Sequence, residues 1–146
     1  MIDRVAMIEA EARTWVGVRV FHKGRTRAGG VDCLGLVMGV GLASGAISGP
    51  IDIPDYGRLP NPRTLIRAMD AHTVPIDKAL AGPGDIAGIS WGLHEAPMHL
   101  AVIVSRPGRL MIVHASPEHG EVKETGFAGS WYARFCRAWR FPNVAV

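Results

Sequence analysis

Cys33 is the residue whose type and setting are most informative about chemistry. It follows Asp32, a side chain suited to cap a helix, and the pair Gly29 and Gly30, which leave room for a substrate backbone. The partial positive charge of a helix N-terminus, added to a neighbouring imidazolium, lowers a thiol pKa from ~8.5 to well below 7. The segment therefore has the features that a nucleophilic thiolate needs. A small thiol buried in the core is the alternative that this segment alone leaves open.

Two histidines on consecutive strands are the candidate partners of this thiol. His99 opens one apolar segment and His114 closes the next, and Pro107 and Gly108 between them suit the centre of a two-residue turn. With that turn Ala101 faces His114, and His99 becomes its diagonal neighbour on the same face, within the ~7–8 Å that such pairs span. We expect one imidazole to orient the other, provided that the turn has two residues. Each histidine taken singly also fits a polar strand end.

The histidines do not show the spacing of a metal site. The set contains no Cys-x-x-Cys or His-Glu-x-x-His pattern, and it consists of His94, His99, His114 and His119 with Cys33. The glycines of segment 24–30 are not followed by the Gly-Lys-Ser/Thr of a phosphate-binding loop. We therefore expect no metal and no cofactor.

The second cysteine and the tryptophans have simpler interpretations. Cys136 lies among aromatic residues and is interpreted as a core thiol, and its context differs so much from that of Cys33 that a disulfide is not expected. Trp91 and Trp131 either wall a substrate cleft or belong to the core, and the sequence leaves both alternatives open.

The elements that must position these side chains are helices first and strands after them. Apolar periodicity and capping residues predict helices over 2–16, 33–43 and 63–71. Strands are expected over 85–90, 100–104, 110–113, 121–124 and 131–141. The proline-rich stretch 48–62 is expected to run over the surface as an irregular loop. This order predicts an α+β fold, with an antiparallel sheet packed on the helices.

Length and composition limit the classes of function. The chain has 146 residues, of which 48% are hydrophobic and 20% charged, and this fits a single domain over 1–146. The net charge of +3 comes from scattered basic residues, so no nucleic-acid partner is expected. No apolar stretch reaches the ~20 residues of a membrane helix, and the N-terminus lacks a signal-peptide pattern. We expect synthesis in the cytoplasm without a signal peptide, and no membrane partner.

Four short segments form an ordered set of motifs. They are Gly-Val-Asp-Cys-Leu-Gly-Leu-Val at 30–37, Pro-Gly-Asp-Ile at 83–86, His-Leu-Ala-Val-Ile-Val at 99–104 and Val-His-Ala-Ser at 113–116. In this order they resemble the motifs of NlpC-like cell-wall cysteine peptidases, in the branch found in phage tails and gene transfer agents. The resemblance covers about 17–141. It implies a papain-like α+β fold and hydrolysis of peptide bonds in peptidoglycan stem peptides, usually next to D-configured residues.

The resemblance also implies a role for each residue of the candidate site. Cys33 would be the nucleophile, His99 the general base and acid, and His114 the third member that orients His99. The imidazole of His99 would take the thiol proton and return it to the leaving amine before water releases the acyl-enzyme. The backbone N–H of Cys33 at the helix start is a natural oxyanion donor, and a second donor is not identified.

Three residues beside the implied substrate cleft bear on specificity. Asp32 matches the family's Asp, so it is expected to hold a substrate amine or backbone as well as to cap the helix. Leu34 stands where a Ser usually follows the Cys, and Phe21 stands where a Tyr is frequent. These two departures leave the triad intact, but they bear on bond preference. Phe21 is carried over as a substrate-binding position.

The resemblance implies a setting as well as a reaction. The expected role is a peptidoglycan endopeptidase docked on the hub or baseplate proteins of a phage-like tail, opening the wall locally in the periplasm for DNA delivery. The protein would then be associated with a virion or tail particle. The alternatives are an inactive structural tail-tip protein with the same fold, and a papain-like amidase or acyltransferase. The loop 48–62 is either a docking loop or a plain surface connection.

Overall fold

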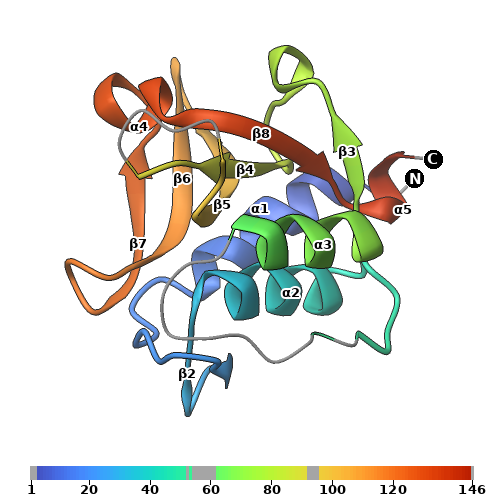
Figure 1. The fold of residues 1–146 in the computed structure, drawn as a ribbon, viewed down its shortest axis with the longest axis vertical. Coiled ribbons are helices and arrows are strands. Elements are labelled where there is room, and N and C mark those ends of the chain that lie inside the picture. Colours follow the sequence, from blue (N-terminus) through green and yellow to red (C-terminus); the bar gives the residue numbers. More distant parts are fainter. Residues whose placement is uncertain (1–2, 52, 54–61, 92–95, 146) are drawn as a thin grey trace.

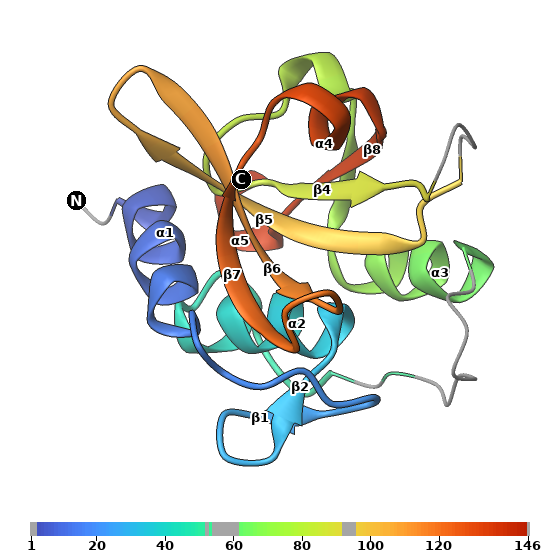
Figure 2. The same ribbon diagram turned by 90° about the vertical axis from the view of Figure 1, so that its left-hand side faces the viewer.

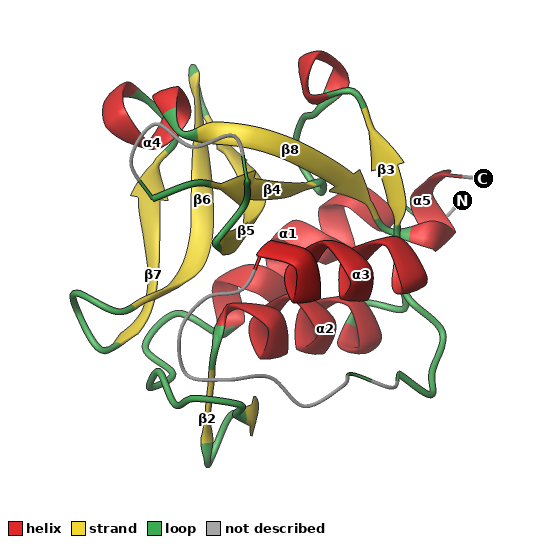
Figure 3. Cartoon of the chain, viewed as in Figure 1, coloured by secondary structure: helices red, strands yellow, loops and turns green. Residues whose placement is uncertain are grey.

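The chain folds as three helices that precede the main antiparallel sheet (Figures 1 and 3). The computed structural model describes residues 3–51, 53, 62–91 and 96–145. Its helices are α1 (Arg4–Thr14), α2 (Cys33–Ala43), α3 (Pro62–His72), α4 (Gly129–Ala133) and α5 (Pro142–Ala145), with a 3-10 turn η1 (Lys78–Leu80). Its strands are β1 (Arg25–Thr26), β2 (Gly30–Val31), β3 (Val74–Ile76), β4 (Ile86–Ile89), β5 (His99–Arg106), β6 (Arg109–Ser116), β7 (Glu121–Gly126) and β8 (Phe135–Arg140). The predicted α+β class is confirmed.

The main sheet is antiparallel, with its strands in the order β3-β8-β4-β5-β6-β7. Figure 2 shows α1, α2 and α3 along one side of this sheet, and the larger core cluster joins them to the strands. A smaller cluster covers the opposite face and includes Ala101, Ile103 and Ile112. Side chains alternate between the faces of a strand, so His99 and His114 project from the face of this smaller cluster.

The β5–β6 hairpin has the register that a two-residue turn predicts. Arg106 faces Arg109, and Gly108 adopts a φ of 75° in the turn, a conformation that favours glycine. The predicted register is confirmed. It places His99 and His114 on the same face as diagonal neighbours.

The three N-terminal helices agree closely with their predicted ranges. The helix at 33–43 is confirmed to the residue, and the helix predicted over 63–71 is α3, one residue longer at each end. The helix predicted over 2–16 is α1, which begins after Asp3, whose carboxylate accepts a hydrogen bond from the Ala6 N–H at 3.0 Å. Among the described residues no helix is both long and apolar enough to cross a membrane.

The strand prediction over 131–141 is wrong at its start. Gly129 has a φ of 59° and opens the helical turn α4, so the strand begins only at Phe135. This turn takes the chain from the β7 edge back to a position between β3 and β4. Residues 74–76, for which no element was predicted, form the edge strand β3, where Pro75 is tolerated because one side of an edge strand needs no partner. The predicted loop 48–62 lies largely outside the described residues.

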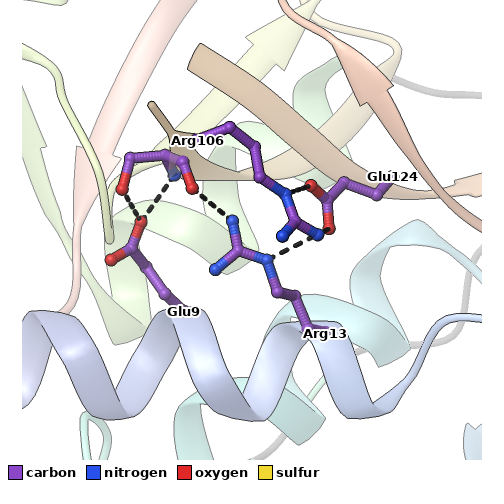
Figure 4. Close-up of polar contacts among 5 residues, drawn as sticks. Glu9, Arg13, Arg106 and Glu124 are labelled. Carbon is purple, nitrogen blue, oxygen red and sulfur yellow. Dashed lines mark hydrogen bonds and ion pairs between the residues drawn. The ribbon is translucent and has the colours of Figure 1, made fainter. Parts of the chain in front are cut away.

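Polar contacts fasten α1 to the sheet (Figure 4). Glu9 accepts hydrogen bonds from the Ser105 N–H at 2.6 Å and from its hydroxyl at 2.7 Å, and Arg13 donates to the Ser105 carbonyl oxygen. Arg13 also pairs with Glu124 at 3.1 Å, and Arg106 binds both oxygens of that carboxylate at 2.6 and 2.8 Å. Glu9, which interrupts the apolar face of α1, therefore ties the helix to β5.

Candidate active site

Cys33 is the first residue of α2, and Asp32 caps this helix as predicted. One oxygen of the Asp32 carboxylate accepts the Gly35 N–H at 2.8 Å and an Arg25 guanidinium N–H at 2.9 Å. The other oxygen accepts the Lys23 N–H at 3.0 Å. The capping role of Asp32 is confirmed, and both of its oxygens are engaged by donors of the chain itself. Contact of Asp32 with a substrate stays a prediction.

The segment before α2 packs directly on the helix start. A Cβ atom placed on Gly35 would lie 2.0 Å from the Gly24 carbonyl oxygen, so this close approach requires glycine. Phe21 is 54% exposed, its N–H donates to the Val31 carbonyl at 2.9 Å, and the Arg19 guanidinium lies 5.1 Å from its ring. The structure thus brings Phe21 beside the strand that leads into Cys33. A role of Phe21 in binding substrate stays a prediction.

The electrostatic setting of Cys33 differs from the one expected at a helix start. Burial, with a smaller contribution from the Asp32 charge, raises the pKa of the Cys33 thiol to about 12. Hydrogen bonds to the sulfur from the backbone of Leu100 and Leu34, and the charge of Arg25, lower the pKa but do not outweigh burial. Cys33 keeps part of its surface accessible, yet the protein packed round its sulfur still desolvates a thiolate. The expectation of a pKa below 7 is wrong for this structure.

His99 and His114 form a directly bonded pair. The Nε2 atom of His99 lies 2.9 Å from Nδ1 of His114, and Nε2 of His114 lies 3.1 Å from the Thr125 hydroxyl oxygen. In the tautomer that a general base requires, His99 Nε2–H donates to His114, which in turn donates from Nε2–H to Thr125. This arrangement leaves His99 Nδ1 as the acceptor for a thiol proton. The Leu100 hydrogen bond brings the Cys33 sulfur to the start of β5, next to His99 in the chain.

Burial keeps both imidazoles neutral. Desolvation lowers the pKa of His99 to about 3, with contributions from the charges of His114 and Arg134. Desolvation lowers the pKa of His114 to about 4, with a contribution from the charge of His119. At neutral pH the site therefore holds a thiol and neutral imidazoles, and the base becomes charged only when it takes a proton.

Aromatic side chains cover the histidine pair. The Trp91 ring stacks on His99 with centroids 5.1 Å apart, and the Trp131 ring meets His114 edge-on at 4.7 Å. Trp131 also lies 6.1 Å from the His99 ring, and the Arg134 guanidinium lies over both indoles. Trp91 and Trp131 are half-buried and lie against the imidazoles, and Trp131 also packs on the smaller core cluster.

Comparison with known proteins gives matches in structure only: no protein-family model and no curated protein matches the sequence. A lipoprotein-like NLP/P60 family protein of Staphylococcus aureus covers 97% of the chain with a TM-score of 0.63 and 18% identity. The NlpC/p60 domain of the peptidoglycan hydrolase SagA covers 92% of it, with a TM-score of 0.62 and 23% identity. The peptidoglycan hydrolase RipB of Mycobacterium tuberculosis covers 94%, with a TM-score of 0.61 and 18% identity. The chain has the NlpC/P60 fold.

The share of each solved chain that our chain covers differs among these proteins. Our chain spans 42% of the staphylococcal protein and 64% of the RipB chain, whereas it spans 97% of the SagA domain. The fold alone is therefore what the comparison shows, and it agrees with the papain-like α+β architecture expected from the motifs.

The other residues that the sequence suggested as metal ligands or thiols are His119, His94 and Cys136. His119 bonds the Ser116 hydroxyl at 2.9 Å, and His94 lies outside the described residues. Among the described residues, no group of three or more His, Cys, Asp or Glu side chains lies together in a way that suits a metal. Cys136, expected in the core, is half-buried, and its thiol donates to the Gly88 carbonyl at 3.4 Å.

Two residues of the site were missed from the sequence. Thr125 was placed just beyond the predicted strand 121–124, but the β6–β7 register puts it diagonally next to His114 on the same face. A longer strand prediction would have found it. Arg134 was assigned to a strand, and only the turn α4 brings its side chain over the indoles.

Proposed function

We propose that the chain is a cysteine-type peptidoglycan endopeptidase that cuts stem peptides. The observation that carries the proposal is the helix-start thiol, Cys33, bonded to the backbone of Leu100 at the start of β5, where the bonded chain from His99 through His114 to Thr125 begins. This is the arrangement of nucleophile, base and orienting group that acyl transfer requires. Two proteins of the same fold, SagA and RipB, are named peptidoglycan hydrolases, which supports the class of substrate.

The geometry supports a two-step reaction, in which the substrate first acylates Cys33 and water then hydrolyses the thioester. The thiol proton passes to His99 Nδ1 while the Cys33 sulfur bonds the substrate carbonyl carbon and the carbonyl oxygen becomes an oxyanion. The first N–H groups of a helix have no intrahelical partner, so the Cys33 N–H can bind that oxygen. The C–N bond then breaks and the proton of His99 goes to the leaving amine. Water attacks the thioester, returns a proton through His99 and frees the thiol.

The test is hydrolysis of purified muropeptides, with products identified by mass spectrometry. We expect Cys33→Ala to lower the rate by about a thousandfold or more, because the nucleophile is lost. Cys136→Ala is the matched control, since it removes the other thiol, whose recorded hydrogen bond goes to the Gly88 carbonyl. Full hydrolysis by the Cys33→Ala protein would sink the proposal. The product masses identify the scissile bond, and they separate an endopeptidase from an amidase or an acyltransferase.

An inactive structural protein with the same fold is the second candidate. The observation that favours it is the pKa of Cys33, which burial raises to about 12, because a thiol that rarely ionises is a poor nucleophile. The two candidates differ in outcome: the structural protein leaves muropeptides intact in the native form as well as in the Cys33→Ala form.

The setting that we propose is the tip of a phage-like tail, where the enzyme would dock on hub or baseplate proteins and open the wall in the periplasm. The motif resemblance at 30–37, 83–86, 99–104 and 113–116 supports this setting. Tail particles purified from producing cells should contain the chain at a fixed ratio to a tail structural protein, as measured by quantitative mass spectrometry. Its absence from intact particles would rule out the setting while leaving the proposed reaction untouched.

A further inference from the structure

Arg134 occupies the outer layer of the histidine site. Its guanidinium carbon lies 4.7 Å from the Trp131 ring centroid and 5.4 Å from that of Trp91, and these two indoles in turn contact the histidine pair. The site is thus layered, with imidazoles inside, indoles over them and a cation outside.

Hydrogen bonds of both the backbone and the side chain fix the position of Arg134. Its backbone N–H closes α4, and its carbonyl oxygen accepts the Ser90 N–H at 2.9 Å, at the end of β4. The side-chain Nε–H donates to the Ser130 carbonyl at 3.1 Å. These contacts use the inner part of the side chain and hold the guanidinium over the indoles.

The outer edge of this guanidinium remains available for a ligand. Among the described residues, none forms an ion pair with Arg134, and no recorded hydrogen bond comes from its Nη groups. The Nη N–H groups of a guanidinium lie in its plane, and their geometry matches a carboxylate with two parallel hydrogen bonds. Stacking also lowers the cost of ordering the long side chain before a ligand arrives.

The charges around the site favour an anion at this edge. The positive charge of Arg134 reaches His99, where it helps to lower the pKa of the imidazole. The Asp32 carboxylate, on the thiol side of the site, is already paired with Arg25 at 2.9 Å. A carboxylate arriving with the substrate would therefore find a preorganised cation beside the base.

We infer that Arg134 determines specificity by binding a free carboxylate on a residue next to the scissile amide. This inference rests on the proposed function, and it names the substrate class as stem peptides whose carboxylates are free rather than amidated. The carboxylate would bind the Nη edge of the guanidinium while Trp91 and Trp131 contact the neighbouring peptide.

The experiment compares one stem tetrapeptide in two forms, with its α-carboxylates free and with them converted to amides. Because hydrogen bonds between charged groups are strong, we expect the native protein to favour the free form by about ten- to a hundredfold in kcat/KM. Arg134→Gln should abolish most of this preference, and Arg134→Lys should keep part of it because the charge remains. Arg109→Gln is the control, since Arg109 is exposed at the β5–β6 turn, at the opposite end of the hairpin from His99.

Two measurements keep the failure of this inference distinct from that of the proposed function. Thermal unfolding shows whether each variant is folded, and calorimetric binding of both peptides to Cys33→Ala tests recognition without chemistry. Equal rates on the two peptides, or a preference unchanged in a folded Arg134→Gln protein, would overturn the inference and leave the hydrolase standing. Carboxylate-selective binding without any hydrolysis would overturn the proposed function alone. Neither hydrolysis nor selective binding would overturn both.

Discussion

Replacement of Asp32 by Ala tests how the start of α2 is built. The change removes three accepted hydrogen bonds, from Gly35, Lys23 and Arg25, at 2.8, 3.0 and 2.9 Å. A lost N-cap costs about 1 kcal/mol, and the other two bonds add about 0.5–1 kcal/mol each, the Arg25 bond counting less because that side chain is partly exposed. The free energy of unfolding should therefore fall by about 2–3 kcal/mol, which lowers the midpoint of thermal unfolding by roughly 6–12 °C in a chain of this size.

Urea unfolding followed by tryptophan fluorescence measures this loss, and Asp32→Asn is its matched control. Asn caps a helix about as well as Asp, and its single amide oxygen can still accept the Gly35 N–H. Its NH2 group cannot accept the Lys23 N–H, and the ion pair with Arg25 is lost, so the Asn variant should lose about 1 kcal/mol, less than the Ala variant. An Asn variant as unstable as the Ala variant would refute the capping argument. So would an Ala variant within about 0.5 kcal/mol of the native protein.

The same two variants should make Cys33 more reactive. The Asp32 charge is the second cause, after burial, of the raised pKa of the Cys33 thiol, so its removal lowers that pKa and increases the thiolate population. Iodoacetamide labelling at a fixed pH near 8, read by mass spectrometry with Cys136 as the internal reference, measures the change. Slower labelling of Cys33 in both variants would contradict the electrostatic account.

Three further predictions address the rest of the site and its supports. In the folded protein the pKa values of His99 and His114, about 3 and 4, lie below the ordinary 6.5. As the pH falls, the unfolded chain therefore binds protons before the folded one, and the free energy of unfolding should decrease below about pH 6.5. Equal urea midpoints at pH 7 and pH 5 would contradict this. Gly35→Ala should cost about 1–3 kcal/mol in urea unfolding, because its Cβ would meet the Gly24 oxygen, and an unchanged midpoint would disprove the close approach. Glu9→Gln should cost about 1–2 kcal/mol through its weakened bonds to β5, and calorimetry should show no loss if those bonds do not matter.

The parts of the site that were predicted correctly are those fixed by local rules. The range of α2 follows from the cap at Asp32 and the apolar run after it, and both were readable in the sequence. The contact between His99 and His114 follows from the two-residue turn, because the register of a hairpin is set by its loop. The catalytic roles of these residues stay predictions, since the similarity to solved structures shows only the fold.

The parts that were not predicted depend on long-range packing. The pKa of Cys33 was expected to fall because the helix start is visible in the sequence, whereas the desolvation that raises it comes from the residues packed around the sulfur. Trp131 and Arg134 reach the histidines only through α4, a turn of five residues that opens at a glycine with φ of 59° and lacks a side-chain cap. Such a turn carries no apolar periodicity, so a strand extended backward from β8 was the simpler expectation.

The resting electrostatics place a demand on any substrate of the proposed enzyme. With the pKa of Cys33 near 12 and that of His99 near 3, proton transfer from the thiol to the imidazole is unfavourable in this structure. An oxyanion held at the Cys33 N–H stabilises the product of the transfer, because attack on the carbonyl consumes the thiolate. A carboxylate bound to Arg134 would act on the imidazole that receives the proton. It offsets the positive charge of Arg134, which lowers the pKa of His99, and so it makes this imidazole a stronger base. On this reasoning the same contact that selects a peptide with a free carboxylate also prepares the base, so amidation should lower kcat as well as raise KM.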